Sequence, residues 1–415
     1  MKKFLVLPAF LAVIGMAIPS KSQTVGRIEA DPVTGETVEV QGGALIFRSA
    51  EGKPLRSLGS EKLPGLFPEP LAFRNGQVAL LVNAGEGEFG EVAVLSHDGR
   101  LLFKGQPRDQ ELFRPELSAD GKAVVGVGSL APNDYLRDLT VARLKSLGLE
   151  ASTEASLAVV TFDLATGTVH ADFYPHVVIS GQPHLALGAR DVVVLGPDSR
   201  VLRLKEGKTL WEFSAKLNSG APAGIQIRAV SPDNRELLLS SDYTGAIQVI
   251  SAEDGRLLFS WEAALARDLP AVGQDPAEST ERAVCSPAYE VPGESVRPPS
   301  VPPQGYPPDW LQRTAAYKVR QVAFVGTDAL LAILWPGAKR GLQCTGPAWA
   351  ALLDRRTGRL RAMEKLERLI QAPQGRPPLS LNAKLVARPS SPWFYCPSGY
   401  LECFPMDLNG MRATP

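Results

Sequence analysis

The residues of this sequence best suited to metal binding or general base catalysis are its histidines. His170, His176 and His184 follow one another closely, and three imidazoles can bind zinc or include a general base. Their separations of 6 and 8 residues place them on no common helix face, and no acidic ligand pattern accompanies them. The fourth, His97, belongs to an expected hairpin turn. We therefore predict structural histidines and no metal site.

A second candidate is the segment Gly126-Val-Gly128-Ser-Leu-Ala131, which matches the G-x-G-x-x-A pattern of dinucleotide sites. In such sites the glycines let the backbone approach a pyrophosphate at the N-terminus of a helix. Here Pro132 intervenes, and the acidic residue Asp163 lies 37 positions beyond Gly126, whereas a dinucleotide site needs about 20. We interpret the glycines as crowded positions at the inner end of a strand.

The remaining short motifs indicate turns rather than catalysis. The sequence contains no G-x-S-x-G, H-E-x-x-H, P-loop or EF-hand pattern. Asp31, Asp163 and Asp354 each precede a Thr-Gly pair at the same spacing, and we expect each carboxylate to close its turn by a hydrogen bond. Calcium would need more carboxylates in each loop. We predict no catalytic residue and no cofactor.

All four cysteines lie in the C-terminal third, and their even number favours disulfides in an exported chain. A zinc site is the alternative, but no C-x-x-C pair is present to nucleate it. Cys396 and Cys403 would face each other across a hairpin centred on Gly399. We predict the pairs Cys396–Cys403 and Cys285–Cys344.

The N-terminus is typical of a secretion signal. Lys2 and Lys3 precede the apolar run from Phe4 to Ile18, and Ser20-Lys21-Ser22 supplies small residues where a signal peptidase reads. An uncleaved anchor is the alternative, although the run is shorter than the ~20 residues that span a bilayer. We predict a signal peptide over residues 1–22, cleaved after Ser22, and export to the periplasm or the medium, with no transmembrane segment in the mature chain.

The elements that must position these residues repeat along the chain. An apolar strand, a turn centred on glycine and a second apolar strand recur, as in VAVLSHDGRLLFKG and IQVISAEDGRLLFSW. Glycine accepts the positive φ that a tight hairpin turn demands. The copies are centred on Gly52, Gly99, Gly167, Gly207, Gly255 and Gly358, with a weaker one at Gly399.

A second hairpin precedes each copy, so every unit holds four strands, A to D, with short A–B and C–D turns. The A–B turns are expected at Thr34-Gly35, Asn75-Gly76, Asp120-Gly121, 188–190, Asp233-Asn234, Thr327-Asp328 and Asn382. Successive C–D glycines are 47, 68, 40, 48, 103 and 41 residues apart, and a four-stranded propeller blade takes about 40 to 50.

These units predict an all-β protein, a β-propeller of seven blades, over residues 23–415. An isolated four-stranded sheet cannot bury both faces, whereas blades arranged radially cover one another. Six or eight blades remain possible, and two stacked β-sandwiches are the main competing fold. The absence of net charge, with 44 basic and 44 acidic residues, argues against a nucleic-acid partner.

The phrases SPDNRELLLSSDYTGAIQVISAEDGRLLFSW and FDLATGT resemble repeats of the WD40-like and quinoprotein-like (PQQ or YVTN) propeller superfamily. Gly207 to Trp211 reproduces the G-x-x-x-W ending of quinoprotein-type repeats, and Gly99 with Phe103 matches it with phenylalanine in place of tryptophan. The Gly-His and Trp-Asp dipeptides of true WD40 repeats are missing. The resemblance implies the fold and not a function.

Three insertions interrupt the repeat, and all fall in B–C or D–A connections. Residues 129–156 contain an expected helix from Asn133 to Leu147, residues 263–317 are rich in proline, and a smaller insertion spans Pro336 to Pro347. Because strands in a blade are antiparallel, these connections share one face. Long loops on a rigid scaffold concentrate binding.

We therefore expect an exported binding or scaffold module that meets an unknown protein or glycan partner in the envelope or medium through that face. Its candidate residues are Glu86, Glu88, Tyr306 and Trp310. The insertions could instead merely cover a central channel. The alternative function is a quinoprotein- or lactonase-like enzyme that uses the channel, which requires polar side chains from different blades to converge on the axis.

Overall fold

The structure is a computed structural model that describes most of the chain from Val25 to Ala413. The described residues are 25–63, 66–83, 90–180, 184–217, 224–241, 245–263, 269, 284–287, 317–336, 342–345, 347–372, 379, 383–389, 393–397 and 402–413. Within these ranges, no helix has the length and apolar character of a membrane span.

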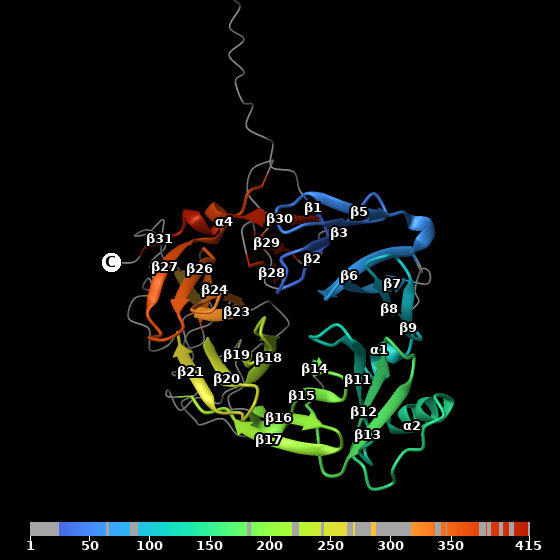
Figure 1. The fold of residues 1–415 in the computed structure, drawn as a ribbon. Helices are drawn as coiled ribbons and strands as arrows, with labels where there is room; N and C mark the ends of the chain where they lie inside the picture. The colour runs from blue at the N-terminus through green and yellow to red at the C-terminus, as the bar shows by residue number, and fades with distance from the viewer. Residues whose placement is uncertain are drawn as a thin grey trace, which may run out of the picture.

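Seven antiparallel sheets stand around one axis, which is the predicted β-propeller (Figure 1). Each sheet is a blade, and in blades 1 to 6 strands A to D follow the chain from the axis outwards. Blades 1 to 3 are β2(Ile28–Ala30), β3(Thr37–Gln41), β4(Ala44–Arg48), β5(Pro54–Leu58); β6(Leu66–Arg74), β7(Gln77–Asn83), β8(Glu91–Ser96), β9(Leu101–Lys104); and β10(Glu116–Leu117), β11(Ala123–Ser129), β12(Leu157–Asp163), β13(Val169–Tyr174).

Blades 4 to 6 follow the same order, and blade 6 gains a fifth, outermost strand from the C-terminus. They are β14(Leu185–Gly188), β15(Asp191–Leu195), β16(Arg200–Lys205), β17(Lys208–Ser214); β18(Ile225–Val230), β19(Glu236–Ser241), β20(Ala246–Ser251), β21(Leu257–Glu262); and β23(Tyr317–Val325), β24(Ala329–Pro336), β26(Trp349–Asp354), β27(Leu360–Lys365), β31(Arg412–Ala413).

Blade 7 closes the ring with strands from both ends of the chain. Its order from the axis is β28(Lys384–Val386), β29(Trp393–Cys396), β30(Glu402–Met406) and then β1(Val25–Gly26). The prediction for this unit was wrong by one strand. The hairpin around Gly399 joins B to C rather than C to D, and the run after Asn382 forms strand A. Strand D is β1, near the N-terminus, and its two residues are too few to give an alternating pattern in the sequence.

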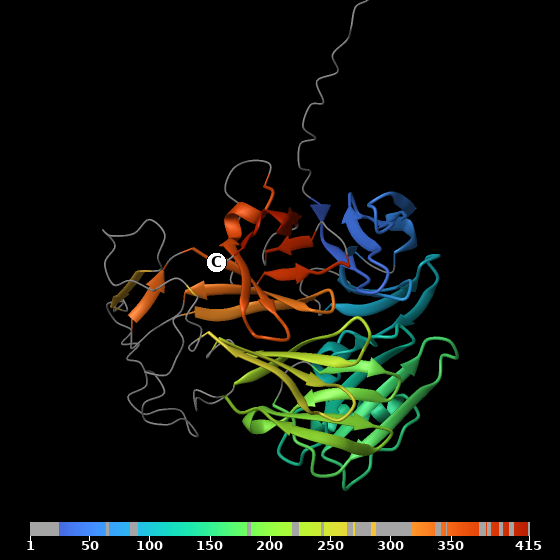
Figure 2. The same cartoon turned by 60° about the vertical axis from the view of Figure 1, so that its left-hand side comes forward.

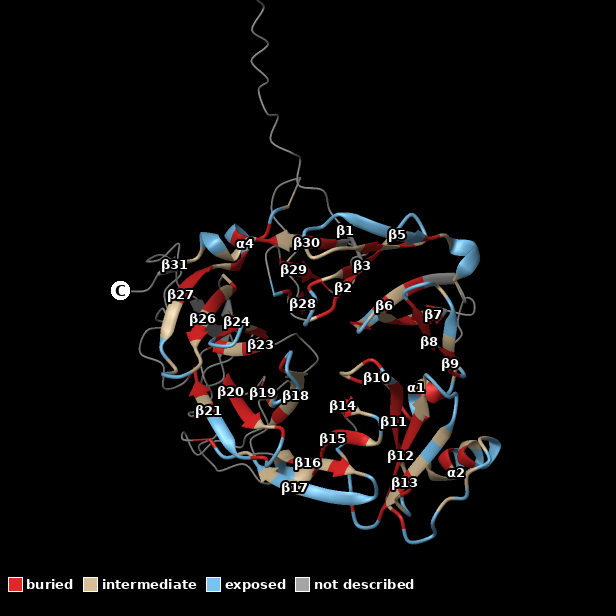
Figure 3. Ribbon diagram, viewed as in Figure 1, coloured by how far each residue is buried: buried red, intermediate tan, exposed pale blue. Residues whose placement is uncertain are grey.

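The core is divided among the joints between blades, because each sheet is apolar on both faces. Every one of the seven joints holds its own cluster of buried apolar side chains. At the joint of blades 5 and 6, Val249 and Phe259 meet Val319 and Leu330. Burying each large apolar side chain contributes about 2 kcal/mol. Figure 3 shows buried middle strands inside exposed outer ones such as β5 and β17.

The C–D turns are built as the repeated phrase predicted. The glycines of these turns have positive φ, for example +83° at Gly99 and +70° at Gly167. In five blades the pairing of strands C and D shifts register next to this turn, with the extra residue in strand D, so one bulged hairpin recurs. The Asp163 carboxylate accepts the Ala165 and Thr166 amides at 3.0 and 2.7 Å, which confirms its predicted turn-closing role.

The described helical elements lie between strands, and η3 lies in the segment that joins β30 to β31. The expected helix over 133–147 is present but shorter, as α2(Arg137–Ser146). Further elements are η1(Ser60–Lys62), α1(Asp109–Leu112), η2(Pro197–Ser199), α4(Leu366–Leu369) and η3(Leu408–Gly410), and a separate two-stranded sheet of β22(Val284–Pro287) with β25(Leu342–Thr345).

Candidate functional site: the loop face

The two faces of the ring differ in how the strands are connected. We call the face with the A–B and C–D connections the tight-turn face, and the face with the B–C and D–A connections the loop face. All three insertions join strands on the loop face: α2 lies between β11 and β12, β22 between β21 and β23, and β25 between β24 and β26. The loop face is therefore the elaborated one.

The tight-turn face consists of short turns that contact one another. The Asp31 carboxylate in blade 1 accepts the Asn75 amide of blade 2 at 2.7 Å, and the Asn75 side chain donates to the Asp120 carbonyl of blade 3 at 3.4 Å. Gly121 completes this contact, since a Cβ there would lie 2.6 Å from the Arg74 carbonyl oxygen. These A–B turns interlock from blade to blade.

On the loop face, a buried ion pair fixes the helical insertion of blade 3. The Asp109 carboxylate in α1 accepts the Nε and Nη2 atoms of Arg143 in α2 at 2.8 and 2.9 Å. The Gln106 amide donates to the same carboxylate at 2.8 Å, and Asp109 is buried. A bidentate pair of this kind fixes orientation as well as distance. The connection before blade 3 therefore holds α2 in place.

The same insertion presents apolar side chains to solvent. Leu144 of α2 is fully buried in a cluster with Leu112 and Phe113, which anchors the helix to blade 3. Tyr135, in the turn before α2, is 81% exposed, and Leu139 in the first turn of the helix is 38% exposed. An exposed aromatic on a fixed element is the type of residue that anchors protein interfaces. Neither residue was identified from the sequence.

The other two insertions pair with each other through β22 and β25. Figure 2 shows this small sheet beside the ring, at the left of the view. Its register sets Cys285 directly opposite Cys344, an arrangement compatible with a disulfide. The pairing of these two cysteines stays a prediction. The Pro-rich D–A connection and the B–C connection of blade 6 therefore form one structural unit on the loop face.

The four candidate residues for binding are not placed by the structure. Glu86, Glu88, Tyr306 and Trp310 all lie outside the described residues. Their connections are nevertheless fixed by the topology, since Glu86 and Glu88 lie between β7 and β8, and Tyr306 and Trp310 lie between β21 and β23. All four therefore belong to connections of the loop face, and their role in binding stays a prediction.

Gly126 and Gly128 are required by the contacts of strand β11. A Cβ on Gly126 would lie 2.7 Å from the Phe113 Cβ, and one on Gly128 would lie 2.7 Å from the Phe113 ring and 2.9 Å from the Thr140 methyl. The prediction that these glycines are crowded is confirmed. The crowding comes from Phe113, in the segment after α1, and from Thr140 of α2, neither of which was identified from the sequence.

The histidines whose surroundings are described make structural contacts. His184 is buried, with its Nε2 3.1 Å from the Val125 carbonyl oxygen, and burial lowers its pKa to about 4. His170 lies 3.4 Å from the Thr168 hydroxyl. Among the described residues, no three His, Cys, Asp or Glu side chains form a group that could hold a metal ion.

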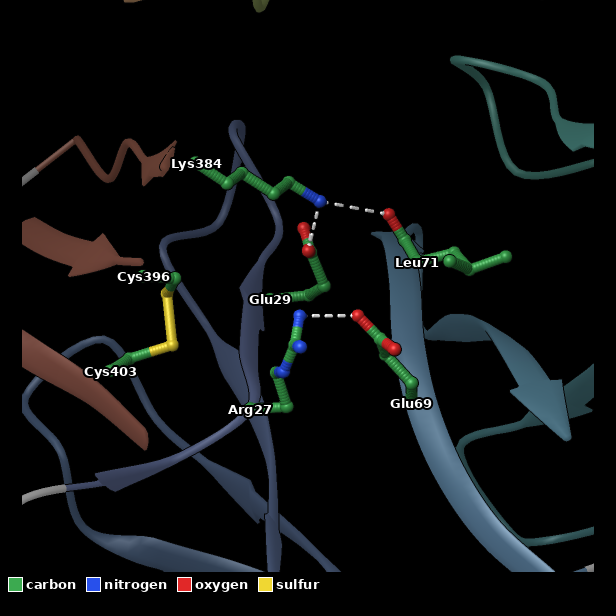
Figure 4. The surroundings of a disulfide bond; sticks show 7 residues. All are labelled: Arg27, Glu29, Glu69, Leu71, Lys384, Cys396 and Cys403. Atoms are coloured by element: carbon green, nitrogen blue, oxygen red, sulfur yellow. Dashed lines mark hydrogen bonds and ion pairs between the residues drawn. A yellow bond between two sulfur atoms is a disulfide. The ribbon is translucent and has the colours of Figure 1, made fainter. Parts of the chain in front are cut away.

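Charged residues on the innermost strands form a cluster that the sequence did not reveal. The Lys384 ammonium of blade 7 pairs with the Glu29 carboxylate of blade 1 and donates to the Leu71 carbonyl of blade 2 at 3.2 Å (Figure 4). Arg27 of blade 1 pairs with Glu69 of blade 2. Burial raises the pKa of Glu29, and the Lys384 charge opposes this effect. These pairs connect three blades near the axis.

Arg74 and Glu116 extend the cluster to blade 3. Arg74 donates to the Ala30 carbonyl at 3.3 Å, and burial lowers its pKa. Burial raises the pKa of Glu116 to about 8, although its carboxylate accepts the Ala186 amide and lies near the charges of Arg74 and Lys384. Carboxylates from three blades thus approach the axis, as the enzyme alternative requires. Glu29 and Glu69 are paired with basic side chains, so their first role is to hold blades together.

No protein family matches this sequence, and no curated protein matches it. Solved structures match in fold at low identity. KlHsv2 (Kluyveromyces lactis) with loop 6CD replaced by a Gly-Ser linker is 9% identical with a TM-score of 0.47, covering 95% of this chain and 98% of that one. The Cps50 (Swd1) propeller domain of Myceliophteria thermophila is 11% identical, TM-score 0.45, over 92% and 96% of the chains. BamB from Moraxella catarrhalis is 12% identical, TM-score 0.32, over 78% and 85%.

These likenesses concern the fold alone and identify no ligand or partner. The order of strands in the seven sheets is an independent observation, and it rests on this chain itself. The chain is a seven-bladed β-propeller that resembles the WD40-like and quinoprotein-like propellers at the level of the fold.

Proposed function

We propose that the protein is an exported binding or scaffold module, which engages a protein or glycan partner of the envelope or medium through its loop face. The observation that carries this proposal is the asymmetry of the ring. One face carries the short A–B and C–D turns, and the other carries all three insertions. Connections on a rigid scaffold can vary without loss of the fold, so binding residues concentrate there.

Two features of the loop face favour a protein partner. The Arg143–Asp109 pair fixes α2, so little ordering entropy is lost when the exposed Tyr135, in the turn that leads into this helix, meets another surface. Tyrosine also provides a large contact area with a polar end, which suits it to interfaces. The predicted signal peptide over residues 1–22 and the disulfide of the structure both agree with an oxidising compartment.

The proposal is tested by pull-down from native envelope and medium. The tagged mature protein is compared with a Tyr135→Ser/Leu139→Ser variant and with a variant in which residues 270–305 are replaced by a short Gly-Ser linker. Val33→Ser is the matched control, because Val33 is 65% exposed in an A–B turn of the tight-turn face. We expect the loop-face variants, confirmed as folded by circular dichroism, to lose a specific partner that the control retains.

The proposal would be contradicted if both loop-face variants retained that partner and Val33→Ser lost it. Binding would then lie on the tight-turn face. The enzyme alternative has its own measurement. Metal analysis of the purified native protein would support it if one divalent ion per chain were lost on replacing Glu29, Glu69 and Glu116 with glutamine.

A further inference from the structure

Blade 7 differs from the other six blades because the ring closes inside it, where β1 pairs with β30 from the other end of the chain and then continues through Arg27 into β2 of blade 1. Strand β1 supplies only two residues to this closure, and the register pairs Val25 with Cys403 and Gly26 with Glu402. In every other blade strands A to D follow one another along the chain, and blade 6 adds β31 outside them. The closing strand therefore depends on β30 being correctly positioned.

The joint between blades 7 and 1 has a small apolar core, with the same number of buried side chains as the joint between blades 2 and 3. It contains six buried side chains, whereas the joint between blades 5 and 6 contains fifteen. Two of the six are Cys396 and Cys403, which meet Ile28 and Ala30 of blade 1, and Cys403 is fully buried. The two half-cystines are therefore part of the apolar core of this joint.

The disulfide acts at the residue where the closing strand pairs. Cys396 and Cys403 are joined across the β29–β30 hairpin with a Cα separation of 4.2 Å, which is the pairing predicted from the sequence (Figure 4). Cys403 is also the partner of Val25 in β1. The bond therefore fixes β30 against β29 at the position that receives β1, next to the core of the joint.

We propose that the Cys396–Cys403 disulfide is a redox latch on ring closure: its formation holds β30 in the register that receives β1, and its reduction opens the joint between blades 7 and 1. The polar ties of this joint are independent of redox state. Lys384 pairs with Glu29, and Arg388 donates to the Gly35 carbonyl at 3.1 Å and to the Ala50 carbonyl. Reduction consequently loosens the joint without unfolding the blades on the far side of the ring.

The chemistry is thiol–disulfide exchange with a disulfide oxidant, which can be a small molecule or a protein. The thiolate of one cysteine attacks the oxidant and forms a mixed disulfide, releasing the first thiol of the oxidant. The second cysteine thiolate then displaces the remaining thiol and forms the Cys396–Cys403 bond. Two cysteine thiols lose two protons and two electrons, and the oxidant disulfide becomes two thiols.

The latch is tested by hydrogen exchange with mass spectrometry on the full mature chain, in oxidised form and after reduction with a phosphine. Alkylation and mapping of Cys396 and Cys403 verify the redox state. We expect exchange in β1, β2 and β28 to β30 to accelerate about tenfold or more on reduction, with β15 and β16 of blade 4 unchanged. Unchanged exchange at the joint with both thiols free would overturn the proposal, and so would uniform acceleration in all seven blades.

Variants separate this latch from the other cysteine pair. Cys396→Ala/Cys403→Ala is expected to exchange like the reduced protein at the joint, and a reductant should change it no further there. Cys285→Ala/Cys344→Ala, on the insertions of blade 6, should keep the oxidised exchange rates of β1 and β30. If this second variant opened the joint and the first did not, the latch would be assigned to the wrong pair. Should the first variant fail to fold, the reduced wild-type chain still provides the test.

Discussion

Replacing Gly121 with alanine is expected to lower the free energy of unfolding by about 3 to 4 kcal/mol. Two costs add at this position. The φ of +70° is unfavourable for any residue with a Cβ, and the new methyl would lie 2.6 Å from the Arg74 carbonyl oxygen and 3.0 Å from the Asn75 Cβ. Both atoms belong to the turn of the neighbouring blade, so neither can move away without disturbing the interlocked A–B turns.

Gly167→Ala is the matched control for this substitution. Gly167 has the same φ of +70°, but nothing lies within 4 Å of the point that an added methyl would occupy. It should lose only about 1 kcal/mol, the cost of the backbone conformation. Urea denaturation of both variants gives the comparison. Equal losses would mean that the A–B turns of blades 2 and 3 are not in contact, which contradicts the described tight-turn face.

The second large effect is a loss of stability as the pH rises. Burial raises the pKa of Glu116 to about 8 in the folded protein, compared with 4.5 for an ordinary glutamate. The folded state therefore favours the neutral carboxyl. Its stabilising contribution is complete below about pH 4.5 and is lost as the pH rises through 8. Glu116 is partly exposed, and solvent therefore reduces the free-energy cost of ionising it in the folded protein to about 2 to 3 kcal/mol.

Glu116→Gln removes this titration and keeps a carbonyl oxygen that can accept the Ala186 amide. At pH 9 the variant should be more stable than the wild type by that amount, and the two should converge at pH 4.5. Glu111→Gln, at an exposed position in α1, serves as the control and should follow the wild type. Thermal or urea unfolding across this pH range gives the result. Parallel curves for Glu116→Gln and wild type would refute the buried position of this carboxyl.

The parts of the fold that were predictable are those encoded by neighbouring residues. A hairpin is specified by its own turn and its own alternation, so the glycines from Gly52 to Gly358 located strands C and D in six blades. Asp163 and Asp354 were assigned correctly because their hydrogen-bond donors lie two and three residues away. The insertions were located by the same means, since they interrupt a regular spacing.

The parts that were missed depend on residues far apart in the sequence. Lys384 and Glu29 are separated by 355 positions, and no local pattern connects them. Strand β1 is two residues long, too short for a periodic signal, and its omission shifted the strand assignment of the last blade. The crowding at Gly128 involves Phe113 and Thr140 from two other elements. Packing between elements, rather than propensity within them, determined each of these features.

The central claim, that the loop face is the binding face, is tested most directly by site-specific photocrosslinking. A benzophenone amino acid replaces Tyr135, two residues before α2, in one variant and Val33 on the tight-turn face in another, both exposed positions. Each variant is irradiated in its native compartment and the products are identified by mass spectrometry. We predict a covalent product with a single partner from position 135 and none from position 33. A partner captured from position 33 and absent from position 135 would contradict the claim.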